Sequence, residues 1–150
     1  MRVHASRTFI RLPRRGVRMP SHRTHKARGS AAERELVHLF WDAGWAAFRA
    51  PASGSMDHEL PDVIAGHGPR KVAIECKLTT SDAKYLTHKE VDELVVFAQR
   101  FGCEAWLGVK FSRKGWFFVS PEDARKTGAS YVVTLADARR KGLSFEELVR

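Results

Sequence analysis

Apolar residues recur at helical spacing in two segments, and these segments predict the two main helices. The first stripe follows Ser30-x-x-Glu33, which has the spacing of a capping box, and predicts a helix over 31–43. The second stripe follows Thr87-x-x-Glu90 and predicts a helix over 88–101. This second stripe is wider than one sheet face requires, which favours either another apolar contact, such as a second subunit, or deeper burial.

Shorter apolar runs bounded by turn residues predict strands. They lie over 45–50, 62–65, 71–77, 104–111, 116–119 and 131–135. The tight turn at 66–69 makes the second and third strands an antiparallel pair, whereas the strands flanking the second helix run parallel. Short helical segments are expected to start at Ser120 and Ser144. The predicted fold class is therefore α/β, with a central mixed β-sheet flanked by helices.

Composition places the chain among soluble globular proteins of one domain. Of its 150 residues, 43% are apolar and 29% are charged, which is enough to bury a core. No apolar run approaches the ~18 residues of a membrane span, and no secretory signal is recognisable. Cys76 and Cys103 are too few for a disulfide framework and are expected to be reduced. These features favour the cytoplasm of a prokaryotic cell, or of the host cell if a virus encodes the protein.

Charge is distributed unevenly and divides the chain into an arm and a domain. Residues 1–28 contain eight arginines, Lys26 and no acid, so they hold the entire formal excess of +9. Residues 29–150 carry 17 basic and 17 acidic side chains and form a single predicted domain. The basic arm is expected to be disordered and suited to a polyanion such as DNA. Two other interpretations remain open, namely translation beginning at Met19 and a mitochondrial transit peptide.

Three side chains in the middle of the chain point to metal-dependent hydrolysis. Glu75 and Lys77 share one face of the third predicted strand because side chains alternate along a strand. The turn at 66–69 is expected to bring Asp62 beside Glu75, and two adjacent carboxylates repel unless a cation lies between them. Oxygen ligands, including the backbone carbonyl of Cys76, favour Mg²⁺, with Mn²⁺ as a substitute. Lys77 is then suited to orient or deprotonate water, or to stabilise charge that develops on a phosphate.

Pro-Asp followed by Glu-x-Lys is the pattern of the PD-(D/E)xK nucleases, although an ordinary solvated strand face is the alternative explanation. The surrounding sequence resembles the archaeal-type Holliday-junction resolvases. The resemblance is carried by residues 26–37, 47–55, 61–66, 73–77 and 97–102, in the same order and at family-like spacing. It implies a restriction-endonuclease-like core and a homodimeric, Mg²⁺-dependent endonuclease that nicks branched four-way DNA junctions symmetrically.

The resemblance also assigns roles to particular residues. Catalytic roles are implied for Glu33, Ser53, Asp62, Glu75 and Lys77. Metal ligation is implied for Glu33, Asp62 and Glu75, beside the carbonyl of Cys76. DNA binding is expected of Lys26, Arg28, Arg34 and Arg49. Dimer contacts are implied for Phe97 and Phe101.

Each role has an ordinary structural alternative. Glu33 completes a capping box, Ser53 lies in a turn, the arginines are solvated charges, and the two phenylalanines belong to the core. At the level of function, the alternatives are another PD-(D/E)xK nuclease of DNA repair or restriction, and a nucleic-acid-binding module without catalytic activity. The compactness of the chain argues against a separate sequence-reading domain, and the retention of all four charged site residues argues against a non-catalytic module.

Overall fold

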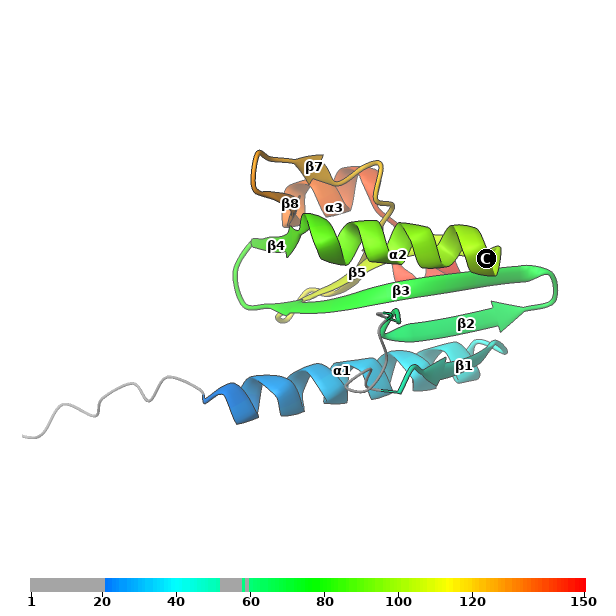
Figure 1. Ribbon diagram of the computed structural model, residues 1–150. Coiled ribbons are helices and arrows are strands. Elements are labelled where there is room, and N and C mark those ends of the chain that lie inside the picture. Colours follow the sequence, from blue (N-terminus) through cyan, green and yellow to red (C-terminus); the bar gives the residue numbers. More distant parts are fainter. Residues whose placement is uncertain (1–20, 52–57, 59) are drawn as a thin grey trace, which may run out of the picture.

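The computed structural model describes residues 21–51, 58 and 60–150. This part of the chain forms a five-stranded mixed sheet, a three-stranded antiparallel sheet and four helices (Figure 1). In chain order the elements are α1 (His22–Asp42), β1 (Ala46–Arg49), β2 (Val63–His67), β3 (Arg70–Thr79), β4 (Ala83–Thr87), α2 (His88–Phe101), β5 (Glu104–Phe111), β6 (Gly115–Val119), β7 (Arg125–Lys126), β8 (Ser130–Thr134), α3 (Leu135–Lys141) and α4 (Phe145–Leu148).

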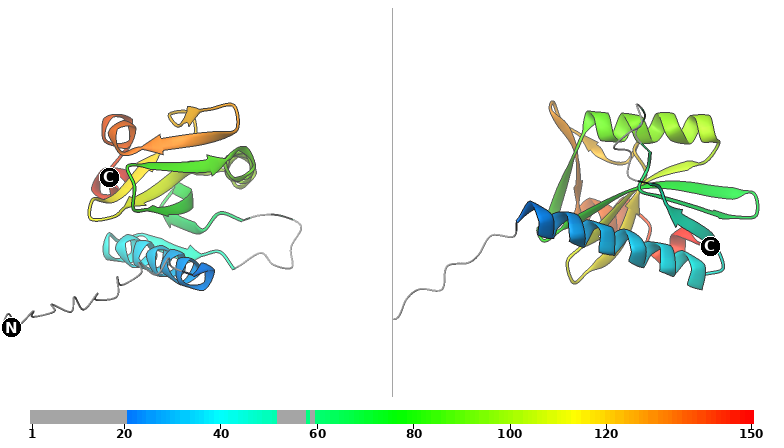
Figure 2. Two further views of the ribbon diagram at one scale, coloured as in Figure 1. Left: turned by 90° about the vertical axis from the view of Figure 1, so that its left-hand side faces the viewer. Right: turned by 60° about the horizontal axis from the view of Figure 1, so that its bottom comes forward.

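Helices cover both faces of the large sheet, whose strand order is β1-β2-β3-β5-β6 (Figures 1 and 2). On one face, Leu36 and Phe40 of α1 share a buried cluster with Ile74 of β3. On the other face, Leu94 of α2 shares a second cluster with Ala73 of β3. β3 is therefore covered on both sides, so Ala73 is buried as completely as its neighbours instead of facing solvent.

Strand pairing follows the prediction from the turn and the crossover. β2 and β3 form an antiparallel hairpin in which Val63 lies opposite Ile74, and continuing this register places Asp62 opposite Glu75. β3 and β5, which are separated in the chain by β4 and α2, pair directly in parallel, with Glu75 opposite Leu107. The mixed sheet flanked by helices is confirmed. A separate small sheet, β4-β8-β7, was not predicted.

The first helix is longer than predicted, because it begins at His22 instead of residue 31. Ser30 therefore lies within α1 and cannot act as its N-cap, so the predicted capping box with Glu33 is wrong. Arg, Lys and Ala are good helix formers, and a segment rich in them can be helical without an apolar stripe. Residues 22–28, which were expected to belong to a disordered arm, are part of this helix.

Two further differences concern the C-terminal third. The short helix expected from Ser120 is a hydrogen-bonded turn, in which the Asp123 amide donates to the Ser120 carbonyl at 3.0 Å before the chain enters β7. No apolar stripe follows this turn, so there is nothing to bury if the helix continued. α3 was missed, although the Thr134 side chain accepts from the Asp137 amide and thereby caps it. None of the described helices is both long and apolar enough to cross a membrane.

Candidate active site

The ammonium group of Lys77 lies between two carboxylates. Its Nζ donates to Oε1 of Glu75 at 2.8 Å and to Oε1 of Glu90 at 2.7 Å. Glu75 and Lys77 are two residues apart on β3 and so face the same side, the side covered by α2. Glu90 comes from the first turn of α2. The three side chains are 15%, 20% and 33% exposed in the order Glu75, Lys77, Glu90, so water screens this trio only partly.

Asp62 is held beside this trio by a backbone contact. Its Oδ2 accepts a hydrogen bond from the Cys76 amide at 2.7 Å. In a strand, the N–H and C=O groups of one residue point toward the same neighbouring strand. The Cys76 carbonyl is therefore directed toward the side on which Asp62 lies. The predicted meeting of Asp62 with the Glu-x-Lys segment is confirmed by this contact and by the register of the hairpin.

Glu33 reaches the same region from α1, held by an arginine. The Arg49 guanidinium donates from Nε to Oε2 of Glu33 at 2.8 Å, and its Nη2 donates to Oγ of Ser30 at 3.2 Å. Glu33 is close enough to raise the pKa of Asp62 by charge repulsion. Arg49 and Glu33, assigned separate roles from the sequence, are thus one salt-bridged unit on the edge of the site.

Burial and like charge disfavour the ionised forms of both central carboxyls. Burial, followed by repulsion from Asp62, raises the pKa of Glu75 to about 7. Burial is also the largest cause of the raised pKa of Asp62, outweighing the hydrogen bond from Cys76. Burial lowers the pKa of Lys77, but its contacts with Glu75 and Glu90 more than reverse this, so Lys77 stays protonated. The positive charge of Lys77 is therefore too small to balance the carboxylates of the site.

Oxygen donors at this site fit a hard divalent cation. Asp62, Glu75 and the Cys76 carbonyl supply oxygen only, which suits magnesium or manganese better than zinc. Across residues 21–51, 58 and 60–150, no three metal-ligating side chains are already converged on one point. Magnesium is compatible with such a site, because it commonly binds one or two carboxylates and completes its shell with water and substrate phosphate.

A basic groove of about 790 Å³ adjoins the trio on the α1 side of the sheet. Cys76 and Lys77 of β3 are among its lining residues. Its remaining basic lining consists of Arg28, Lys84, Lys110 and Arg113, beside the imidazole of His25. The lining also contains an acid, Glu35, which is paired with Lys110. Cationic side chains from separate elements along a groove are suited to a phosphate backbone.

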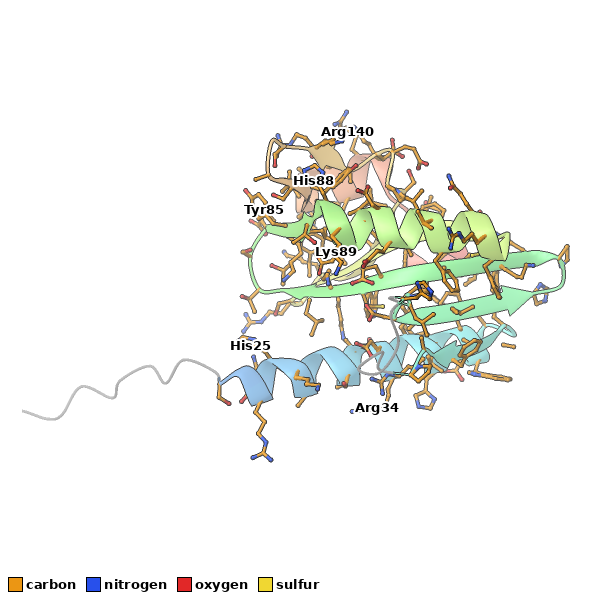
Figure 3. The ribbon with its side chains drawn as sticks, viewed as in Figure 1. His25, Arg34, Tyr85, His88, Lys89 and Arg140 are labelled. Atoms are coloured by element: carbon orange, nitrogen blue, oxygen red, sulfur yellow. The ribbon has the colours of Figure 1, made fainter. Side chains whose placement is uncertain are left out.

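The remaining predicted residues lie at different places. Arg28 lines the groove, whereas Arg34, labelled on α1 in Figure 3, is exposed and is not among the lining residues. Lys26 is exposed near the start of α1. Phe97 and Phe101 stack on α2 with ring centroids 5.3 Å apart. Ser53 lies outside the described residues.

Sequence reasoning missed several residues of this region. Thr87-x-x-Glu90 was recognised as a helix start, but nothing local indicated that Glu90 also reaches Lys77. The groove residues Lys84, Lys110 and Arg113 belong to no motif, and they meet only because β4, β5 and the following turn converge. Lys110 and Arg113 lie at and just beyond the end of the predicted strand 104–111, a place where a basic residue is too common to be informative, and Lys84 lies in no predicted element.

The chain matches the family described as archaeal Holliday junction resolvase (Hjc) over residues 24–150. It is 37% identical over 108 residues to a crossover junction endodeoxyribonuclease Hjc of Archaeoglobus fulgidus. The aligned region covers 72% of this chain and 79% of that protein. It is 38% identical over 131 residues to that of Sulfurisphaera tokodaii, covering 85% of this chain and 89% of that protein.

The fold is also similar to a crystal structure of Archaeoglobus fulgidus Hjc, described as a Holliday junction resolvase from an archaeal hyperthermophile. The TM-score is 0.77 at 33% sequence identity, and the match covers 81% of this chain and all of that one. The match over 24–150 extends further than the resemblance seen in the sequence, which covered about residues 26–119. The small second sheet and α3 therefore fall within the matched region.

Proposed function

We propose, because this chain belongs to the archaeal Holliday junction resolvase family, that it is a structure-selective endodeoxyribonuclease that resolves four-way DNA junctions. The observation that carries the proposal is the Asp62 carboxylate held by the Cys76 amide at 2.7 Å, next to Glu75, whose carboxylate lies 2.8 Å from the Lys77 ammonium. The reaction is hydrolysis of two phosphodiester bonds placed symmetrically in the junction.

Mg²⁺ is the proposed cofactor, with Mn²⁺ as a substitute. Asp62, Glu75 and the Cys76 carbonyl would hold it, with Glu33 as an additional acid near Asp62. When bound, the ion supplies a water of lowered pKa and a positive charge beside the phosphate oxygens. The raised pKa values of Asp62 and Glu75 support this assignment, because a cation relieves the repulsion that raises them.

Lys77 acts as a cation in this proposal and not as a base. Burial alone would lower the pKa of Lys77, but the carboxylates of Glu75 and Glu90 raise it by more. Its Nζ therefore keeps its protons at neutral pH. A protonated amine beside the reacting phosphate stabilises the negative charge that develops as the bond breaks. It also donates hydrogen bonds that orient the attacking water.

DNA is held by the basic side chains around the site. The groove lined by Arg28, Lys84 and Lys110 leads away from Lys77 and takes the phosphates of one junction arm. Lys26, Arg34 and the basic residues before α1 provide further phosphate contacts. Such contacts recognise the branched shape of the backbone and not its base sequence.

Two further assignments come from the family resemblance and from symmetry. Ser53, in the segment before Asp62, is assigned a role in cleavage. The protein is a homodimer joined through Phe97 and Phe101, because a four-way junction has approximate two-fold symmetry and two paired nicks need two sites. Residues 29–150 form the nuclease domain of each subunit.

Asp62→Asn tests the assignment directly. Labelled four-way junctions and linear duplexes of the same sequence are incubated with protein in Mg²⁺ or in chelator. Wild-type protein is expected to nick only the junction, and only with Mg²⁺. Asp62→Asn is expected to lower the single-turnover cleavage rate by ~100-fold or more, as for removal of a group that acts in the transition state.

Binding separates a lost metal ligand from a lost fold. Asp62→Asn is expected to bind the junction at least as tightly as wild type, because one negative charge beside the phosphates is gone. Asp42→Asn, an exposed change at the end of α1, serves as the control. Equal cutting of duplex and junction would remove the structure-selective function, and wild-type cleavage by Asp62→Asn would remove the metal assignment.

A further inference from the structure

Glu90 uses its two carboxylate oxygens for different contacts. Oε2 accepts from the Thr87 amide at 2.8 Å and from the Thr87 hydroxyl at 3.0 Å, which closes the capping box of α2. Oε1 accepts from Nζ of Lys77 at 2.7 Å. The first contacts start a helix, and the second reaches a strand 13 residues earlier in the chain. One side chain thus joins the beginning of α2 to the site.

A second capping box in the chain shows that the contact with Lys77 is not part of capping. Ser144 and Glu147 of α4 make the same reciprocal bonds, at 2.7 Å and 3.2 Å. Within the described residues, Glu147 has no salt bridge to a lysine or arginine. Capping therefore needs only one of the carboxylate oxygens, and Glu90 has the other available for Lys77.

Lys77 needs a partner other than Glu75 if Glu75 binds a metal ion. A carboxylate that coordinates Mg²⁺ shares its charge with the ion and attracts an ammonium group less strongly. The lysine side chain is long and rotates freely, so an ammonium held by one weakened contact leaves its place. Glu90 is fixed by Thr87 and lies outside the pair aligned across the hairpin, so its contact persists.

We propose that Glu90 is a positioning residue that holds the Lys77 ammonium beside the scissile phosphate while Glu75 is engaged with the metal. This inference rests on the proposed nuclease function of the same site. It assigns Glu90 no contact with metal or DNA, since it acts through Lys77. The start of α2 is thereby part of the catalytic apparatus and not only of the fold.

Glu90→Gln tests the proposal, because glutamine also closes a capping box but carries no charge to hold the ammonium. Single-turnover cleavage of a four-way junction at saturating protein is expected to slow by about 10-fold to 100-fold, the range for a displaced catalytic group. The dissociation constant for the junction, measured in Ca²⁺, is expected to stay within about twofold of wild type because no DNA contact changes.

Glu147→Gln is the matched control, since it removes a carboxylate from the other capping box. It is expected to keep its capping box and to cleave at the wild-type rate. An unchanged cleavage rate in Glu90→Gln overturns the proposal. Equal loss of cleavage in both variants, or weaker junction binding in place of slower cleavage, also overturns it.

A measurement without DNA separates this inference from the proposed function. Reductive methylation of Lys77 is followed by mass spectrometry, with the exposed Lys114 as the internal reference. Adding Mg²⁺ is expected to speed methylation of Lys77 severalfold in Glu90→Gln and to leave it unchanged in wild type. If wild type cuts no junction but Mg²⁺ speeds methylation of Lys77 only in Glu90→Gln, the proposed function fails and the positioning role stands. Equal methylation in the two proteins with Mg²⁺ overturns the positioning role.

Discussion

Glu75 carries the clearest electrostatic cost of any single side chain in the site. Its pKa is raised from the usual 4.5 to about 7, first by burial and then by repulsion from Asp62. A carboxyl that ionises less readily in the folded state favours folding fully only below its unfolded pKa. That contribution is lost as the pH rises from 4.5 through 7. Metal-free protein is therefore destabilised by this residue at neutral and alkaline pH.

Glu75→Gln is expected to stabilise the metal-free protein while abolishing cleavage. At pH 8 the gain in the free energy of unfolding is about 1–3 kcal/mol, since each pKa unit corresponds to about 1.4 kcal/mol. At pH 5 the gain is small, because Glu75 is then mostly protonated. Urea denaturation in chelator at both pH values measures it, with the exposed Glu146→Gln as control. A gain that is the same at both pH values would contradict the assignment of the cost to Glu75.

Residues joined by local rules were predictable, and residues joined by packing were not. Alternation along β3 put Glu75 and Lys77 on one face, and a four-residue turn fixed the position of Asp62. Glu90 was predicted only as a capping residue, because its contact with Lys77 depends on how α2 lies across the sheet. The salt bridge from Glu33 to Arg49 replaced the predicted capping box for the same reason, since it depends on β1 lying beside α1.

At the scale of the elements, α2 presents an apolar surface that the described residues leave partly uncovered. Val96 is 45% exposed and Phe101 is 47% exposed, while Val91, Leu94 and Ala98 are buried against the sheet. The wide apolar stripe seen in the sequence thus divides into a buried side and an exposed side. An exposed aromatic stacked on a neighbour is the kind of residue that anchors protein interfaces.

Phe101→Lys is expected to weaken the proposed dimer. Loss of a central aromatic from an interface costs about 2 kcal/mol or more, which raises the dissociation constant by about 30-fold. Sedimentation equilibrium measures this constant. Phe48→Lys, which changes an equally exposed phenylalanine on β1, is the control and is expected to leave dimerisation intact. The same dissociation constant in wild type and Phe101→Lys would place the interface elsewhere.

Element boundaries were predictable where capping and apolar period agree. α2 and β5 start and end where expected, since Thr87 caps the helix and Gly102 ends it in a left-handed conformation at φ 72°. α1 begins nine residues early, because a polar basic helix lacks the stripe by which helices are recognised. β4 was missed because the strand has only five residues and is partly polar. Its partner β8 also lies more than 40 residues further along the chain.

At the scale of the whole molecule, positive charge is concentrated at one end of the sequence. Residues 29–150 are formally neutral, yet four of their basic side chains, Lys77, Lys84, Lys110 and Arg113, line the groove beside the site. Residues 1–20 add six arginines and no acid. The domain is thereby suited to place DNA, while the preceding segment is suited to attract it at longer range.

Deleting residues 1–20 is expected to weaken binding to junction and duplex alike. If all six arginines meet phosphates, the slope of log affinity against log salt becomes less steep by about 5. Preference for the junction over the duplex is expected to persist, because the groove and the dimer remain. Fluorescence anisotropy across a salt series measures both quantities. An unchanged slope would show that this segment makes no contact with DNA.

The charged residues of the site come from α1, β2, β3 and α2, and therefore from both layers over the sheet. No single one of these elements carries all the charged residues that the reaction needs. β3 and β5 pair although β4 and α2 separate them in the chain, and such non-local contacts form slowly. A chain emerging from the ribosome therefore has no complete site until α1, the β2–β3 hairpin and α2 have all packed together. Complete folding of the domain is thus a condition for nuclease activity.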